Sequence, residues 1–344
     1  MSEFRVNSIT NQDGSAGPQV CGVSTFSGKS GVQIPSGPTE FRRQDGGGRG
    51  RAVFSGGRNS PVFYSNLSVV EIVTTGDATD FGDMSKKVNG GSGNVSSSTR
   101  GITSGGYEGS PGANVKHIDF FNFASNGGSN NFGELTELSN DHGGYSNGRR
   151  GIFSMGYPSY SGKLTFITIA STGNATEFGS LLEPCYATSG GINSPTRAVF
   201  SAIETPSSPQ NKRTEFVSFE TLGNSQEFGE LSVARNACSG GSSSTRGLVQ
   251  GGLTPSVSDV IDFCTIATLG NFTDFGNLTV ARRSPGGCSS ETRGLCAAGT
   301  TPSNQNVIDF VTISTTGNST DFGDLSYSAR NVRGNSDAHG GLAQ

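Results

Sequence analysis

Hydrophobic and polar positions alternate along one recurring stretch of this chain. Between Val307 and Ser314, one register holds Val307, Asp309, Val311 and Ile313, and the other holds Ile308, Phe310, Thr312 and Ser314. A period of two residues, rich in Val, Ile, Thr and Phe, is typical of a β-strand. Because the second register is not purely polar, we expect both faces of this strand to be covered.

This stretch belongs to a unit that recurs six times. A Phe-Gly pair marks each unit at intervals of 46 to 51 residues, and an arginine opens each unit. The pairs are Phe81-Gly82, Phe132-Gly133, Phe178-Gly179, Phe228-Gly229, Phe275-Gly276 and Phe322-Gly323, and the arginines are Arg51, Arg100, Arg150, Arg197, Arg246 and Arg293. A repeat of this length with about four short strands predicts propeller blades. We therefore expect an all-β fold, with a six-bladed β-propeller over residues 51–344.

Glycine pairs and the last residues of the sequence carry two further predictions. A Gly-Asn or Gly-Asp pair follows the alternating strand in five units, as at Gly317-Asn318. Glycine at the first central position suits a two-residue type II′ hairpin turn, so we expect a hairpin there.

The segment Arg333–Leu342 parallels the Gly/Ser-rich strand of the other units. We expect this C-terminal strand to be the innermost strand of the first blade, which closes the ring and removes exposed edges.

The column of arginines has two interpretations. The six side chains could line the channel and bind an anion, or they could be structural, bonding carbonyl groups or pairing with acidic residues. Matched charge columns commonly form structural ion-pair networks, which favours the second interpretation. The acids before Phe-Gly would be the partners: Asp80, Glu177, Glu227, Asp274 and Asp321.

Composition and charge exclude several classes of protein. A net charge of −4 argues against nucleic-acid binding. No apolar run is long enough to cross a membrane, and we expect no signal peptide and no membrane insertion. Apolar residues make up only 31% of the chain, which alone would suggest disorder, but the strict repeat indicates packed sheets. The six cysteines form no Cys-x-x-Cys pair, so we expect free thiols.

Residues that could carry chemistry are scattered. The three histidines, His117, His142 and His339, stand in different contexts, whereas a metal site needs clustered ligands. The triplet Asp80-Phe81-Gly82 occurs in kinases, but here it belongs to the repeat and the other kinase motifs are missing. We therefore predict no enzymatic activity, no catalytic residue, no bound metal and no cofactor.

The loops after the Gly-Gly pairs vary most between units. In the first three units they carry aromatic residues, and in the last three they carry Thr-Pro-Ser instead. Exposed aromatic rings suit contacts with sugars or proteins, although such rings can also pack on their own loops. We predict that the ligand-binding residues are Phe63, Tyr64, Tyr107, Tyr157 and Tyr160.

Residues 1–50 differ from the repeat, because short β-prone pieces alternate there with Gly, Ser and Pro. Such pieces gain most by adding a strand to the sheet edge of another chain. We expect an extended N-terminal docking arm whose contact residues are Phe4, Val6, Ile9, Val32 and Ile34.

The repeat resembles the kelch repeat. The resemblance rests on the order of its segments and on an acid before an aromatic residue: Asp119-Phe120, Glu215-Phe216, Asp262-Phe263 and Asp309-Phe310. Kelch blades usually carry a tryptophan in the last strand, whereas this chain has none and has the phenylalanine of Phe-Gly there. The third unit departs further, with Thr165-Phe166. The resemblance implies a kelch-like propeller and, as one function, a free protein-interaction scaffold.

The N-terminal text SEFRVNSITNQDGSAGPQV, together with GVQIPSGPTEFR, resembles virion structural proteins of marine cyanobacterial tailed viruses (cyanophages). Repeats similar to Thr-Gly-Asn-Ser-Thr-Asp-Phe-Gly-Asp-Leu follow in those proteins. The resemblance implies a tail, fibre or capsid-surface component of a virion assembled in the host cytoplasm. Its partners would be other virion proteins through the arm and a host-surface glycan or protein through the propeller loops.

Overall fold

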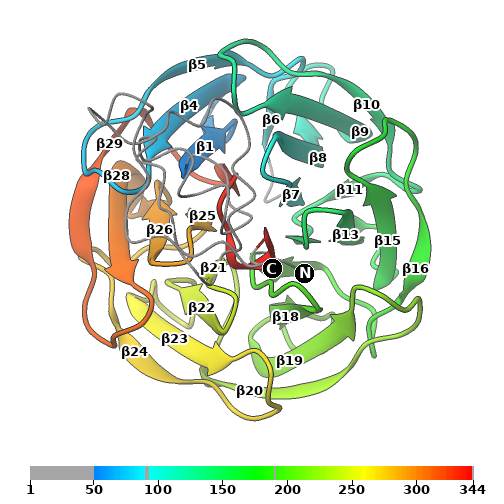
Figure 1. Ribbon diagram of the computed structural model, residues 1–344, viewed down its shortest axis with the longest axis vertical. Helices are drawn as coiled ribbons and strands as arrows, with labels where there is room; N and C mark the ends of the chain where they lie inside the picture. Colours follow the sequence, from blue (N-terminus) through cyan, green and yellow to red (C-terminus); the bar gives the residue numbers. More distant parts are fainter. Residues whose placement is uncertain (1–49, 90–92, 190, 343–344) are drawn as a thin grey trace, which may run out of the picture. The chain divides into compact units, whose positions relative to one another are not determined.

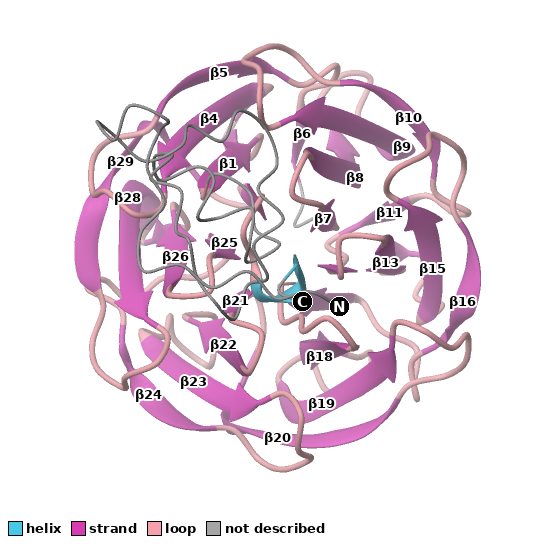
Figure 2. Ribbon diagram, viewed as in Figure 1, coloured by secondary structure: helices cyan, strands magenta, loops and turns pink. Residues whose placement is uncertain are grey.

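The alternating stretches form the strands of six antiparallel β-sheets, arranged as blades around a central axis (Figure 1). The computed structural model describes residues 50–342, apart from residues 90–92 and 190. Each blade is a sheet of at least four strands, so the predicted all-β, six-bladed propeller is confirmed. Within the described ranges, the only helical segment is the short 3₁₀ turn η1 (Gly340–Leu342) (Figure 2), and no helix there is long and apolar enough to span a membrane.

From the axis outward, the blades are built as follows. Blade 1 contains β30 (Arg333–Ser336), β1 (Arg51–Ser55), β4 (Asn66–Glu71) and β5 (Thr79–Asp83). Blade 2 contains β7 (Asn94–Ser96), β8 (Arg100–Glu108), β9 (Ala113–Asn122) and β10 (Asn130–Glu134). Blade 3 contains β12 (Gly144–Ser146), β13 (Arg150–Ser154), β15 (Lys163–Thr168) and β16 (Thr176–Ser180).

The second half of the ring repeats this order. Blade 4 contains β17 (Ala187–Ser189), β18 (Arg197–Glu204), β19 (Asn211–Ser218) and β20 (Gln226–Arg235). Blade 5 contains β21 (Ser239–Ser242), β22 (Arg246–Gln250), β23 (Val260–Thr265) and β24 (Thr273–Asn277). Blade 6 contains β25 (Gly286–Ser289), β26 (Arg293–Ala297), β28 (Ser303–Thr312) and β29 (Thr320–Ala329). Short additional strands are β2 (Arg58–Asn59), β3 (Val62–Phe63), β6 (Val88–Asn89), β11 (Ser139–Asn140), β14 (Tyr157–Pro158) and β27 (Thr300–Thr301).

The strand β30 closes the ring, as predicted. It pairs with β1 in antiparallel register from Ala52↔Ser336 to Ser55↔Arg333. Beyond it, the Asp337 carboxylate accepts hydrogen bonds from the backbone N–H groups of Gly50 and Arg51, both 2.8 Å long. The first blade is therefore assembled from two parts of the chain separated by almost the whole ring, and its inner edge is covered.

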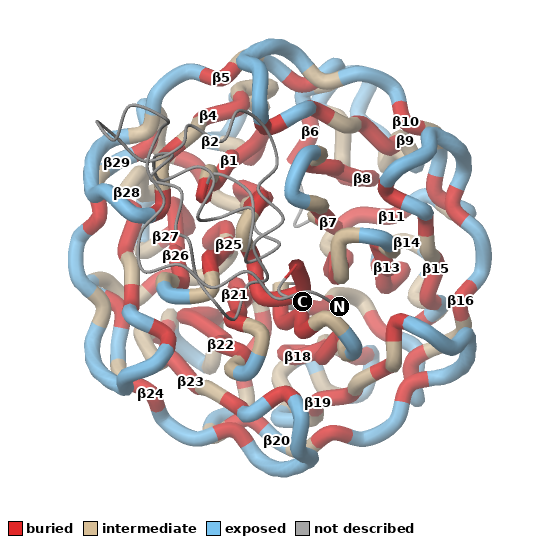
Figure 3. Tube along the Cα trace, in the orientation of Figure 1, coloured by how far each residue is buried: buried red, intermediate tan, exposed pale blue. Residues whose placement is uncertain are grey.

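The hydrophobic core lies between neighbouring blades, since buried residues line the inner strands and the outer rim of the ring is exposed (Figure 3). One cluster joins Phe178 and Leu181 of blade 3 to Phe200 and Val217 of blade 4. The phenylalanine of each Phe-Gly pair is at most 3% exposed. It is the bulged residue of the outer strand: in blade 1, Leu67 pairs with Gly82 and Ser68 with Asp80, so Phe81 lies between them without a partner. Such a β-bulge re-aims the side chain.

The Gly-Asn and Gly-Asp pairs do not form type II′ hairpin turns, so that prediction was wrong. The strand before Gly76 ends at Glu71, where the N–H of Thr74 already bonds the Glu71 carbonyl. Gly76 has a φ of 154°, far from the value that a type II′ turn requires. Its N–H donates instead to the carbonyl of Phe322 in the neighbouring blade.

Each glycine of these pairs belongs to an outer joint, the contact that connects the Phe-Gly pair of one blade with the Gly-Asn pair of the next. The glycine N–H groups donate at 2.7–3.0 Å to the phenylalanine carbonyls of the preceding Phe-Gly pairs; donors and acceptors are Gly76–Phe322, Gly127–Phe81, Gly173–Phe132, Gly223–Phe178, Gly270–Phe228 and Gly317–Phe275. In five joints the Asn or Asp after the glycine makes a second contact. Its side-chain oxygen accepts a hydrogen bond of 3.0–3.1 Å from a backbone N–H of the blade that carries the Phe-Gly pair. The joint thus bonds part of each outer strand edge, which would otherwise be open to pairing.

The arginine column is structural, but its partners are carbonyl groups and not the predicted acids. Each guanidinium donates at 2.5–3.2 Å to a carbonyl at the end of the third strand of the next blade; the pairs are Arg51–Phe123, Arg100–Ile169, Arg150–Phe219, Arg197–Ile266, Arg246–Ile313 and Arg293–Ile72. Five of these guanidinium groups also lie 4.5–5.2 Å from a phenylalanine ring of their own blade. Within the described ranges none pairs with an acid before Phe-Gly, because those acids, like Asp80, face solvent.

The acid of the acid-aromatic pair is buried and bonded in four blades. Asp262 and Asp309 are fully buried and pair with the fully buried Arg235 and Arg282 at 3.2 and 2.9 Å. Glu215 of blade 4 pairs with Arg213, and Asp119 of blade 2 pairs with His117. Removing one member of such a pair would leave an uncompensated buried charge. In these four blades the buried acid therefore anchors the third strand.

After β30 the chain turns into the axis and forms a plug. His339 lies there with its Nε2 atom 3.2 Å from Ser146 Oγ and 3.2 Å from the Ser96 carbonyl. Those serines belong to an inner circle in which backbone N–H groups donate to the next blade's polar side chain, as from Ser96 to Ser146 and from Ser146 to Asn193, both at 3.0 Å. The plug therefore joins the inner strands of several blades.

We expect the stability of the protein to fall as the pH drops below about 6.5. Burial lowers the pKa of His339 to about 4, although its bond with the Ser96 carbonyl acts in the opposite direction. Below pH 6.5 the unfolded state binds more protons than the folded state, so the stability present above pH 6.5 is lost progressively down to about pH 4. His142 is also buried, which lowers its pKa to about 3, so it too reduces the stability of the protein as the pH falls.

Urea denaturation at pH 7 and pH 5.5 measures this loss, which should be about 1 kcal/mol per histidine. The variant His339→Gln should lose about half as much stability over this range as the wild type, because His142 still titrates. A wild-type-like pH dependence in this variant would contradict the assignment.

Candidate binding cavity at the channel mouth

The loops after the Gly-Gly pairs and the connections between blades meet at one end of the central axis. A cavity of about 360 Å³ opens there. Its polar wall consists of Arg58, Asp141, Thr188, Glu204, Asn236, Arg283, Ser284, Arg330 and Asn331. Tyr157, Tyr186 and Leu253 add apolar surface. A second cavity of about 90 Å³ shares Thr188, Cys238 and Pro285 with it and is lined by glycines of the inner strands.

Four residues in the left-handed backbone region shape the mouth of the cavity. Asp141, Ala237, Ser284 and Asn331 have φ values of 51° to 57°, and each precedes the inner strand of a blade. Residues other than glycine are uncommon in this region. The N–H of Asn331 donates to the Ser284 carbonyl, and the N–H of Ser284 donates to the Ala237 carbonyl, both at 2.8 Å. Backbone bonds from blade to blade therefore fix the rim of the cavity.

Three arginines approach one another on this rim. Arg58 and Arg330 pair through two backbone hydrogen bonds of 3.0 Å. Burial lowers the pKa of the Arg330 guanidinium, and the neighbouring charges of Arg58 and Arg283 lower it further. None of the three guanidinium groups forms an ion pair with a carboxylate of the described residues. The wall thus holds three guanidinium groups and two carboxylates, and the charge of one of these, Asp141, acts on the pKa of Arg330 in the opposite direction.

Acidic and amide groups stand among the same wall residues. The Asn236 amide donates to Glu204 Oε2 at 3.0 Å, and the Asn331 amide donates to Asp141 Oδ1 at 3.4 Å. Burial raises the pKa of Glu204, and the charge of Asp141 adds to this effect. Asn236 is only 8% exposed, and its Oδ1 atom has no hydrogen-bond partner among the described residues. A ligand with both an anionic group and hydroxyl donors would match this wall.

The five predicted aromatic residues separate into three places. Tyr157 and Tyr160 form a cluster with Tyr186, with ring centroids 5.4 and 4.2 Å apart. Of these, Tyr157 and Tyr186 line the cavity, and Tyr157 is 42% exposed. Sequence reasoning missed Tyr186, which lies in the connection before β17.

The other three predicted aromatics lie away from the cavity. Phe63 packs near Tyr107, with ring centroids 6.2 Å apart. Tyr64 packs on Tyr327 at 4.5 Å, and the Tyr327 hydroxyl donates to the Gly56 carbonyl. Tyr64 therefore packs within the ring. The predicted arm residues Phe4, Val6, Ile9, Val32 and Ile34 lie outside the described residues.

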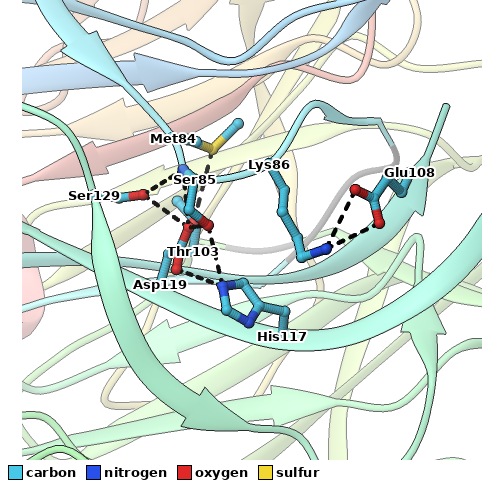
Figure 4. A network of polar contacts seen from close by, with 8 residues as sticks. All are labelled: Met84, Ser85, Lys86, Thr103, Glu108, His117, Asp119 and Ser129. Carbon is cyan, nitrogen blue, oxygen red and sulfur yellow. Dashed lines mark hydrogen bonds and ion pairs between the residues drawn. The ribbon is translucent and has the colours of Figure 1, made fainter. Parts of the chain in front are cut away.

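A serine from the connection after β5 also comes together with a histidine and an aspartate of β9 in blade 2 (Figure 4). His117 Nε2 lies 2.6 Å from Asp119 Oδ1 and 3.2 Å from Ser85 Oγ, so one nitrogen serves both groups. A catalytic relay uses the two ring nitrogens for these two contacts. Burial would raise the pKa of Asp119, but hydrogen bonds from His117, Ser85 and Ser129 outweigh it and lower the pKa.

The same arrangement recurs without histidine, which identifies it as part of the blade. Ser232 Oγ donates to Asp262 and Thr279 Oγ1 donates to Asp309, both at 2.6 Å. The cluster in blade 2 is therefore the local form of the buried acid column.

Cysteines and acidic residues give no further candidate centre. In the described ranges, no group of three His, Cys, Asp or Glu side chains lies close enough to hold a metal ion. The five cysteines in those ranges are buried and form no disulfide with one another. Burial raises the pKa of the Cys264 thiol to about 12, which keeps it protonated.

The channel-mouth cavity is thus the site whose charge and shape suit a ligand. No protein-family model matches the sequence, and no curated protein matches it either.

Proposed function

We propose that this chain is a non-enzymatic virion structural protein. Residues 1–50 dock on the particle, and the propeller presents its channel-mouth face to a host-surface glycan or protein. The observation that carries the binding role is the cavity of about 360 Å³ with three arginines and two tyrosines, on the face where the loops differ most between blades. The virion assignment is supported by the resemblance of residues 2–20 and 31–42 and of the repeats to cyanophage proteins.

The bonding of the ring supports the division of roles between arm and propeller. Outer strand edges are bonded by loops of the next blade, and the inner edge of blade 1 is covered by β30. A ring bonded in this way offers few free backbone groups for strand addition. Attachment to a particle by added strands therefore belongs to residues 1–50, which contain β-prone pieces.

A free kelch-type protein-interaction scaffold is the second candidate. It would use the same face, because propellers commonly bind partners with their loops, and fold alone does not decide between the two. The candidates differ in location, since only the virion protein is a component of purified particles.

Mass spectrometry of purified virus particles should detect this chain in stoichiometric amounts. The full chain and residues 45–344 should then be offered separately to particles that lack the protein. We expect both to give the same β-type circular dichroism spectrum and only the full chain to attach. Equal attachment would place the docking surface on the propeller, and absence from the particles would favour the free scaffold.

A further inference from the structure

Arg283 and Arg330 occupy the same place in the repeat, one residue before the left-handed residues Ser284 and Asn331. Each forms an antiparallel bridge with the residue after a glycine, Arg283 with Thr300 and Arg330 with Arg58. The preceding position holds Arg282 in blade 5 and Ala329 in blade 6, and both of these residues are fully buried. Arg283 and Arg330 therefore stand one residue outside the core, where they line the cavity together with Arg58.

We propose that the channel-mouth cavity binds an acidic saccharide. Arg58, Arg283 and Arg330 hold its anionic group, and Tyr157 and Tyr186 face its ring. The inference rests on the proposed function in one respect, because it identifies the host-surface ligand as a charged glycan. The binding itself is a property of the isolated protein.

The charge on the wall suits an anion. Three guanidinium groups face two carboxylates, Asp141 and Glu204, so an excess of positive charge remains. Guanidinium groups bind the oxygens of carboxylate, sulfate and phosphate in bidentate geometry. An anion between Arg58, Arg283 and Arg330 would also relieve the repulsion that lowers the pKa of Arg330.

The remaining wall suits the rest of a sugar. Tyr157 offers an exposed ring, and an aromatic ring with a polar tip can cover the apolar face of a saccharide while its hydroxyl bonds water or ligand. The unpartnered Asn236 Oδ1 atom can accept a hydrogen bond from a sugar hydroxyl. A cavity of about 360 Å³ also lies within the usual range of about 300–1,000 Å³ for sites that bind small molecules.

Calorimetric titration of the full chain tests the proposal. The probes are glucuronate, galacturonate, glucose 6-phosphate, neutral glucose and inorganic sulfate. At least one acidic sugar should bind with a Kd of about 1 mM or below, and glucose should bind at least about tenfold more weakly, since it lacks the charge-assisted bonds. A preference for the uronates or for the sugar phosphate identifies the anionic group. No binding of any acidic sugar, or equal binding of inorganic sulfate, overturns the assignment.

Two substitutions locate the site. Arg283→Gln and Arg330→Gln should each weaken acidic-sugar binding on the order of tenfold or more, the expected loss of a charge-assisted hydrogen bond. The matched control is Arg149→Gln, an exposed arginine in the turn before β13 whose side chain makes no bond to the described residues. It should bind like the wild type. Unchanged binding in both cavity variants, with wild-type thermal stability, overturns the proposal.

The outcomes separate this inference from the proposed function. Sugar binding by a protein that is absent from particles would retain the site and reject the virion role. A particle component that binds no acidic sugar would retain the virion role and reject the site.

Discussion

Removal of residues 333–344 should leave most of the protein unfolded. The deletion takes β30 from blade 1, exposes the inner edge of β1, and removes the bonds of Asp337 to Gly50 and Arg51. It also removes Asn335, whose amide donates to the carbonyls of Val95 and Ile102 at 3.0 and 3.1 Å. We expect a loss on the order of 5 kcal/mol or more, against a total stability of about 5–15 kcal/mol for a typical domain.

Thermal and urea denaturation followed by circular dichroism measure this loss. Asn335→Ala provides the comparison, because it keeps the strand and leaves two buried carbonyls without that donor, at a cost of about 1–3 kcal/mol. If the deletion costs no more than the point substitution, strand pairing by β30 does not hold the ring closed.

Gly179→Ala should destabilise the protein by about 2–3 kcal/mol, the usual cost of forcing an additional carbon into a close-packed contact. A Cβ atom at Gly179 would lie against the carbonyl of Gly223 in the next blade, closer than any normal contact. The opposing atom is backbone and cannot rotate away, so the outer joint must open. The backbone of Gly179 lies outside the left-handed region, so the substitution adds no strain of that kind.

Gly173→Ala is the matched control for this steric effect. It lies in the same kind of joint, its backbone is also outside the left-handed region, and a Cβ atom there would meet nothing within 4 Å. Its N–H still donates to the Phe132 carbonyl after substitution. Urea denaturation should show a change within about 0.5 kcal/mol for this variant. Equal effects of the two substitutions would reject close approach as the reason for glycine in Phe-Gly.

The blade number and the ring closure could be predicted because each depends on repetition along the chain. Phe-Gly at fixed intervals gives the number of blades, and the segment at Arg333 repeats the inner strand of the other units. The part that the Gly-Asn pairs play in joining neighbouring blades could not be predicted from repetition. Their hydrogen bonds run to a different blade, and a glycine before an asparagine has the same local propensity in a hairpin as in a joint between blades.

The cavity was only partly predictable for a related reason. Tyr157 was recognisable because its loop differs from those of the last three blades. Arg283 and Arg330 stand at the same position of their units, but Arg58 stands at another, so no single column of the repeat brings the three together. Only the circular order of blades places them on one rim. The available signal was the arginine that recurs at one position in the last two units, as Arg283 and Arg330.

The pairing of β30 with β1 also sets the order of events during synthesis. Asp337 and Gly50 are 287 residues apart in sequence. At about 5–20 residues per second, a ribosome needs roughly 15–60 s to make the intervening chain. During that interval blade 1 lacks its inner strand while later blades emerge, and contacts of such large sequence separation form slowly. The nascent ring therefore exposes an unpaired edge of β1 for many seconds, which makes this protein a predicted client of ribosome-associated chaperones.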